Sequence, residues 1–149
     1  MLANWGTCPG AEARTCWLRF EIAGGRHLVV VGVYVPPDYR TNPTQEEVLE
    51  AVRKFLNGLP GRCLKLVTGD WNAQLLRNRD GQTGRWCLRN DIHKLNSAAK
   101  RKSSERLHSF LQETRMFAVS THTTKAAANA NGRARTWKLI ARKANGDEA

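Results

Sequence analysis

Two polar side chains follow an apolar segment at a spacing that suits phosphate chemistry. Residues 63–68 predict a buried strand, and Asp70 and Asn72 come directly after it in Gly-Asp-Trp-Asn. Ligands of open α/β sheets lie at such strand ends, and a turn would bring both side chains to one pocket. A carboxylate orients or deprotonates water or helps to hold a divalent cation, and a carboxamide hydrogen-bonds a phosphate oxygen without adding repulsion. The pair therefore suits phosphodiester hydrolysis. The alternative, which four residues alone favour, is an Asx turn or a cap.

A third polar group stands at the end of another apolar run. Tyr34 lies in Val-Tyr-Val-Pro-Pro, two residues before Pro36. Its phenol could hydrogen-bond a phosphate or a leaving oxygen, although tyrosines near strand ends more often only pack their rings.

The elements that position these groups follow from the periodicity of the apolar residues. Residues 15–22 alternate with a period of two and predict a half-exposed strand, which a turn over residues 23–26 follows. The β-branched run over residues 28–35 predicts a strand buried on both faces. Thr-Gln-Glu-Glu at residues 44–47 is a capping box, and it predicts an amphipathic helix from Gln45 to Asn57. Strand, helix and strand then form a βαβ unit with parallel strands.

Downstream, residues 74–103 are polar and predict a long surface loop. Ser103 or Ser104 caps a second predicted helix, whose apolar positions are Leu107, Phe110, Leu111 and Met116. Short strands are expected at Phe117–Ser120 and at Thr136–Ile140.

The charge of the chain indicates an anionic partner. The 149 residues suit one domain or part of one, and the formal net charge is +11, most of it after residue 93. Nucleic acid is the first candidate partner and an anionic membrane is the second. The residues that could neutralise phosphates there are Lys100, Arg101, Lys102, Arg133 and Arg135. A solvated basic segment without a specific ligand is the alternative.

Compartment signals are few. No Cys-x-x-Cys spacing indicates a zinc or redox site, and we expect reduced thiols. There is neither a signal peptide nor an apolar run long enough to span a membrane. The expectation is an intracellular protein, cytoplasmic or nuclear, that does not bind a membrane.

The order of these motifs resembles the endonuclease/exonuclease/phosphatase superfamily, and most of all the endonuclease domains of non-LTR retrotransposons. The resemblance covers residues 15–140, with residues 1–14 and 141–149 as flanking segments. The matching motifs, in order, are Tyr34-Val35-Pro36, the helix over residues 45–57, Gly69-Asp70-Trp71-Asn72, Glu105-Arg106-Leu107-His108-Ser109-Phe110, Phe117–Ser120 and Thr136-Trp137.

What the resemblance implies is an α/β fold, the central part of a two-sheet sandwich whose mixed sheets are flanked by helices. It implies that Asp70 orients or activates the attacking water, that Asn72 holds the scissile phosphate, and that Tyr34 lies beside that phosphate. Thr136 and Trp137 would lie near the nucleic-acid groove, and DNA is the expected substrate. The cofactor would be Mg²⁺ or Mn²⁺.

The chain also departs from the family pattern. The family has an asparagine and a metal-binding glutamate before the hairpin, and an aspartate and a Ser-Asp-His motif after the Thr-Trp strand; residues 1–14 and 141–149 do not supply them. We therefore expect a domain truncated at both ends, with an incomplete ligand set and little or no activity as this chain. The alternatives are a non-catalytic basic module that binds nucleic acid, and a fragment of a phosphatase of the same superfamily that acts on small phosphate esters.

Overall fold

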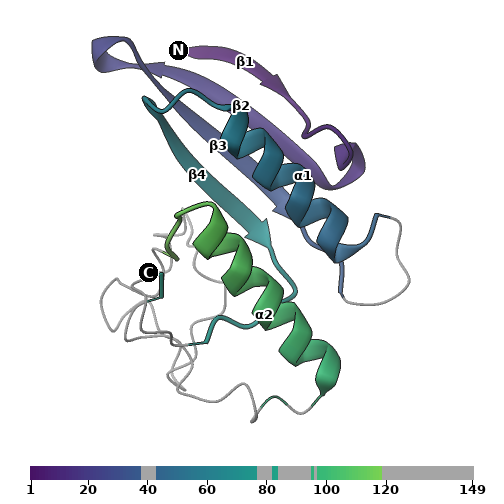
Figure 1. Cartoon of the computed structure of the whole chain (residues 1–149). Helices are drawn as coiled ribbons and strands as arrows, with labels where there is room; N and C mark the ends of the chain where they lie inside the picture. The colour runs from purple at the N-terminus through teal and green to yellow at the C-terminus, as the bar shows by residue number, and fades with distance from the viewer. Residues whose placement is uncertain (38–42, 77–81, 84–94, 96, 119–149) are drawn as a thin grey trace, which may run out of the picture. The chain divides into compact units, whose positions relative to one another are not determined.

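Four strands and two α-helices make up the described part of the chain. The computed structural model describes residues 1–37, 43–76, 82–83, 95 and 97–118. Along the chain the elements are β1 (Leu2–Gly6), the 3-10 turn η1 (Glu12–Arg14), β2 (Thr15–Ile22), the 3-10 turn η2 (Ala23–Gly25), β3 (Arg26–Tyr34), α1 (Gln45–Gly58), β4 (Cys63–Asp70) and α2 (Ala98–Glu113) (Figure 1). The chain divides into two units, Met1–Asn72 and Ala73–Ala149.

The first unit holds a mixed four-stranded sheet of order β1-β2-β3-β4. Strands β2 and β3 form an antiparallel hairpin around η2, and β3 pairs with β4 in parallel. The predicted hairpin, helix and parallel crossover are therefore confirmed, and the fold is of the α/β class. β1 was not predicted; it pairs antiparallel with β2, and the Glu21 N–H donates to the Met1 carbonyl oxygen at 2.9 Å.

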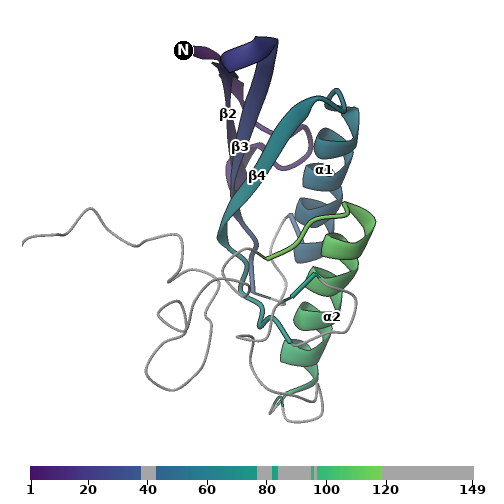
Figure 2. The same ribbon diagram turned by 90° about the vertical axis from the view of Figure 1, so that its left-hand side faces the viewer.

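The prediction that β3 is buried on both faces was wrong. Val29, Val31 and Val33 are buried, whereas the alternate residues of β3 are half-buried or exposed. α1 covers one face, which Figure 2 shows with the sheet seen nearly edge-on. The open face, as we call the other one, carries Leu18, Phe20, Leu28, Val30, Leu64 and Leu66, which are register neighbours on β2, β3 and β4.

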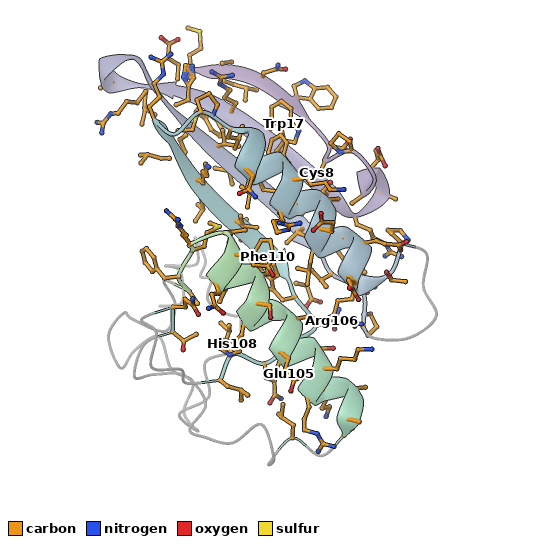
Figure 3. The ribbon with its side chains drawn as sticks, in the orientation of Figure 1. Cys8, Trp17, Glu105, Arg106, His108 and Phe110 are labelled. Atoms are coloured by element: carbon orange, nitrogen blue, oxygen red, sulfur yellow. The ribbon has the colours of Figure 1, made fainter. Side chains whose placement is uncertain are left out.

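Helix α1 packs on the sheet through the apolar stripe that the sequence predicts. Val48, Val52 and Leu56 have at most 1% of their surface exposed. Trp17 lies beside α1 (Figure 3), and its ring stacks on that of Phe55 with centroids 5.3 Å apart. The Lys65 Nζ donates to the Leu56 carbonyl oxygen at 2.8 Å. One face of the sheet and one stripe of the helix thus form the core of this unit.

The predicted capping box is present at the start of α1. The Glu47 N–H donates to Thr44 Oγ1 at 3.3 Å, and the Thr44 N–H donates to Glu47 Oε2 at 2.7 Å. These hydrogen bonds to Thr44, first the backbone one and then that of its hydroxyl, hold the pKa of the Glu47 carboxyl below its usual range. Two backbone N–H groups at the start of α1 thus have hydrogen-bond acceptors.

Replacing Thr44 with alanine should therefore lower the free energy of unfolding by about 1 kcal/mol, because one helix N–H loses its acceptor. Urea unfolding of both proteins measures the difference, with Thr44→Ser as the control that keeps the hydroxyl. Folding lowers the pKa of Glu47, so the ionised carboxylate contributes to the stability of the folded state at neutral pH. This contribution disappears as the pH falls through the lowered pKa. The difference should narrow in acid, and a difference that widens there would contradict the assignment.

The second unit contains α2, whose start differs from the prediction. The cap is Ser97, whose Oγ accepts from the Lys100 N–H at 3.2 Å, so the helix begins at Ala98 and includes the end of the predicted loop. Ser103 and Ser104 do not cap; they are buried within the helix. The predicted Leu107, Phe110 and Leu111 are buried, whereas Met116 lies beyond the last helical residue.

The end of the described chain also differs from the prediction. Phe117 and Ala118 are not in a strand, and the Ala118 N–H donates to the Gln82 carbonyl oxygen at 2.8 Å. The rest of that predicted strand and the strand at Thr136–Ile140 lie outside the described residues. Neither of the two described α-helices is long and apolar enough to cross a membrane.

Candidate functional site

Two of the predicted site residues meet at the carboxyl ends of β3 and β4. Tyr34 and Asp70 are register partners in the parallel ladder, although 36 positions separate them in the sequence. The Val35 N–H donates to the Asp70 carbonyl oxygen at 2.8 Å and continues the pairing past the end of β3. Parallel pairing therefore brings a phenol and a carboxylate side by side at one edge of the sheet.

Gly69 allows this close approach of the two strands. Its φ is +146°, and a Cβ built on it would lie 1.8 Å from the Val33 carbonyl oxygen. No side chain fits in that space, and few L-residues adopt that backbone conformation. The glycine of Gly-Asp-Trp-Asn is thus required by the backbone at the end of β4.

The carboxylate of Asp70 holds the turn that follows β4. Its Oδ1 accepts a hydrogen bond from the Asn72 N–H at 3.0 Å, which is the Asx turn that the sequence left open as an alternative. Among the described residues, no partner is found for Oδ2 of Asp70. Within the described part of the chain, one oxygen shapes the turn, and the other can meet a ligand or a water.

Asn72 connects the turn to the end of β3. It has a positive φ of 43°, in the left-handed region that asparagine tolerates better than most residues. Its Nδ2 donates to the Val35 carbonyl oxygen at 2.9 Å. One of the two amide hydrogens is therefore committed to the backbone, while the side-chain oxygen and the second hydrogen can meet a phosphate or a water.

Arg14 joins this group, and the sequence analysis missed it. Its guanidinium carbon lies 5.1 Å from the centre of the Tyr34 ring, in a cation–π arrangement. Among the described residues, Arg14 has no carboxylate partner, so its charge is not neutralised by them. The signal was in the hairpin register: Thr15 pairs with Val33, so the residue before Thr15 stands opposite Tyr34.

The described residues do not form a metal centre at this edge. No group of three or more His, Cys, Asp or Glu side chains suited to a metal ion occurs in the described part of the chain. A divalent cation that is held by protein oxygens needs several of them, and Asp70 supplies one carboxylate here. The expected Mg²⁺ or Mn²⁺ therefore does not fit the described residues as a complete ligand set.

The predicted nucleic-acid contacts are described in part. Lys100 and Lys102 are exposed near the start of α2, whereas Arg101 is half-buried and its Nη1 donates to the Leu95 carbonyl oxygen at 3.1 Å. This bond gives Arg101 a structural role. The other four predicted contacts, Arg133, Arg135, Thr136 and Trp137, lie outside the described residues.

On α2, the predicted family motif over residues 105–110 includes residues that hold the fold together. Glu105, Arg106, His108 and Phe110 all project from this helix (Figure 3), and Phe110 is buried. His108 Nε2 accepts a hydrogen bond from the Leu76 N–H at 3.0 Å, which requires that nitrogen to be unprotonated. His108 therefore anchors the segment after Asn72 to α2.

Comparison of the chain with family models, with curated proteins and with solved structures gave no match.

Proposed function

We propose that this chain is part of a phosphodiester-hydrolysing domain that acts on nucleic acid, related to the endonuclease/exonuclease/phosphatase superfamily and to its retrotransposon members. The observation that carries the proposal is the meeting of Tyr34, Asp70 and Asn72 at the carboxyl ends of two parallel strands. Each residue type suits a different part of phosphodiester chemistry, and the ends of parallel strands are where ligands of such sheets bind.

In this proposal the side chains divide the work between the water and the phosphate. The free Oδ2 of Asp70 accepts a proton from the attacking water or orients it. The Tyr34 hydroxyl and the remaining amide hydrogen of Asn72 donate to phosphate oxygens. Arg14, next to Tyr34, adds positive charge against the charge that develops on the phosphate. No step is assigned to a metal, because the described residues do not form a metal centre.

The proposed fold is one layer of a two-sheet sandwich. The open face supports it, since Leu18, Leu64 and Leu66 keep 40%, 49% and 44% of their surface exposed. Monomeric proteins rarely expose a large contiguous apolar patch, and such a patch marks a surface that packs against another one. In a sandwich, the second sheet would cover this face.

The substrate follows from charge. A formal net charge of +11 attracts polyanions over a distance and raises the local concentration of nucleic acid. DNA is the first substrate to test. A small phosphate ester of the same chemistry would compete with DNA for the site if it were the true substrate.

A non-catalytic module that binds nucleic acid is the second candidate. It is favoured by the Asx turn, because a carboxylate that shapes a turn needs no catalytic role. The exposed Lys100 and Lys102 would then supply binding without chemistry.

Nicking of supercoiled plasmid by the full chain separates the two candidates. The assay contains Mg²⁺, with an EDTA control, and compares the wild type with Asp70→Asn, which keeps an oxygen for the Asn72 N–H but loses the charge. If Asp70 activates water, nicking should fall by a factor of about 100 or more, in the range of general-base effects. Glu21→Gln is the matched control, since it removes an exposed carboxylate elsewhere in the same sheet.

Binding of a labelled oligonucleotide over a range of salt concentrations completes the test. Asp70→Asn should bind as tightly as the wild type or slightly more tightly, because it removes a negative charge. Nicking by the wild type that Asp70→Asn leaves unchanged would contradict the catalytic proposal. Salt-dependent binding by a folded wild type that never nicks would contradict hydrolysis by this chain and support the second candidate, and the superfamily resemblance would then describe ancestry and not activity.

A further inference from the structure

Strand β4 ends the described sheet on one side and leaves a long edge open. It pairs with β3 on one side only, and no described strand lies on its other side. The side chains of Leu64, Lys65 and Leu66 in its first half are exposed. Unpaired backbone groups along such a strand are a template for pairing with another strand.

The edge also lacks the devices that usually block this pairing. β4 contains no proline, and its only lysine, Lys65, is turned to the helix side, where its Nζ bonds the Leu56 carbonyl oxygen. The Asp70 carbonyl oxygen bonds to β3, so the backbone groups of residues 64, 66 and 68 also point to β3 by alternation. Those of residues 65, 67 and 69 point outward, away from the sheet, whereas the Cys63 N–H donates to the Pro60 carbonyl oxygen at 3.0 Å.

The side chains of β4 select one register for pairing with itself. In a two-fold antiparallel pair centred on Leu66, Leu66 faces Leu66, Leu64 faces Thr68, and Lys65 faces Val67. Arg62, in the turn just before the strand, then takes the position opposite Asp70 at both ends of the pair.

The two neighbouring registers are worse. A pair centred on Lys65 places two lysines opposite each other, and like charges directly opposite destabilise a strand pair. A pair centred on Val67 places Leu64 opposite Asp70, so that a carboxylate meets an apolar side chain. Of these three registers, only the one centred on Leu66 avoids both faults, and only it places Arg62 opposite Asp70.

We propose that β4 is an interaction surface for a second copy of this chain, which pairs with it antiparallel about a two-fold axis at Leu66. The two four-stranded sheets then form one continuous sheet, with their open faces side by side. The interface is isologous and closes, so it yields a dimer and no fibre. This inference does not depend on the proposed hydrolytic activity, and its tests measure no cleavage.

The first test measures the mass of the full chain by sedimentation velocity from low to high micromolar concentration. The wild type should reach twice the chain mass as the concentration rises. Leu66→Lys should weaken association by a factor of about 10 or more, because two lysines would meet on the axis. Leu18→Lys is the matched control. It introduces the same charge on the same open face at a position of similar exposure, but on β2 and away from the β4 edge.

The outcomes separate edge pairing from its alternatives. Loss of the dimer in Leu66→Lys alone supports the proposal. Equal loss in both variants would overturn it in favour of packing between open faces, and a wild type that stays monomeric throughout would overturn it as well.

The second test fixes the register by a disulfide. Cα atoms directly opposite each other in a pair without mutual hydrogen bonds lie about 4.5 Å apart, within reach of a disulfide. Leu66→Cys, made together with Cys16→Ser to remove an exposed thiol, should give a reducible dimer on mild oxidation. Leu64→Cys in the same background should not, since Leu64 faces Thr68. Equal cross-linking of both variants would contradict the register.

Discussion

Alanine at position 69 is expected to lower the free energy of unfolding by about 3 kcal/mol or more, the largest effect expected of alanine at any described glycine. The added Cβ would lie 1.8 Å from the Val33 carbonyl oxygen, and the φ of +146° disfavours any L-residue. The clash is with backbone, so the strands themselves must separate. Urea unfolding followed by circular dichroism measures the loss.

Gly61→Ala is the control for this change. Gly61 lies in the turn before β4, has no positive φ, and a Cβ on it would meet nothing within 4 Å. Its alanine variant should stay within about 0.5 kcal/mol of the wild type, as surface substitutions usually do. If Gly69→Ala were as stable as Gly61→Ala, the close contact between the ends of β3 and β4 would be wrong, and with it the pairing of Tyr34 with Asp70.

Truncation of Leu56 to alanine is the second large effect, with an expected loss of about 3 kcal/mol. Leu56 retains 1% of its surface and lies in the stripe of α1 that faces the sheet. Removing its side-chain carbons loses burial and leaves a cavity that the neighbouring valines fill only in part. Urea unfolding also measures this loss of stability. An unchanged dependence of the free energy on urea concentration would show that both proteins expose the same surface on unfolding.

Leu18→Ala is the matched control for Leu56, because Leu18 keeps 40% of its surface exposed on the open face. Its loss should stay well below that of Leu56→Ala, since less apolar area returns to water. Equal losses would indicate that the open face is covered as completely as the face under α1, which would contradict the arrangement of the sheet.

Local sequence patterns were sufficient to predict most of the secondary structure of the first unit. The alternation of β2, the turn after it, the capping box at Thr44 and the stripe of α1 are all determined by residues within a few positions of one another. The parallel pairing of β3 and β4 followed from their order around the helix. The sequence also placed Tyr34 and Asp70 each near the end of a predicted strand, whereas their proximity was predicted only as an implication of the resemblance.

Tertiary structure decided the features that depend on distant partners. β1 exists because β2 offers it a hydrogen-bonded edge, and its own residues carry no clear period. Ser97 caps α2, and the buried Ser103 and Ser104 lie inside it; all three serines suit a cap by type, so residue type alone did not distinguish them.

At the candidate site, the sequence determined which residue types follow β3 and β4. It did not determine what each polar atom does. The bond from Asn72 to the Val35 carbonyl oxygen joins residues 37 positions apart, and the approach of Arg14 to Tyr34 follows from the hairpin register. Residue type and short spacing are local properties, whereas the free oxygen of Asp70, the occupied amide of Asn72 and the open face of the sheet depend on which strands and helices pack together.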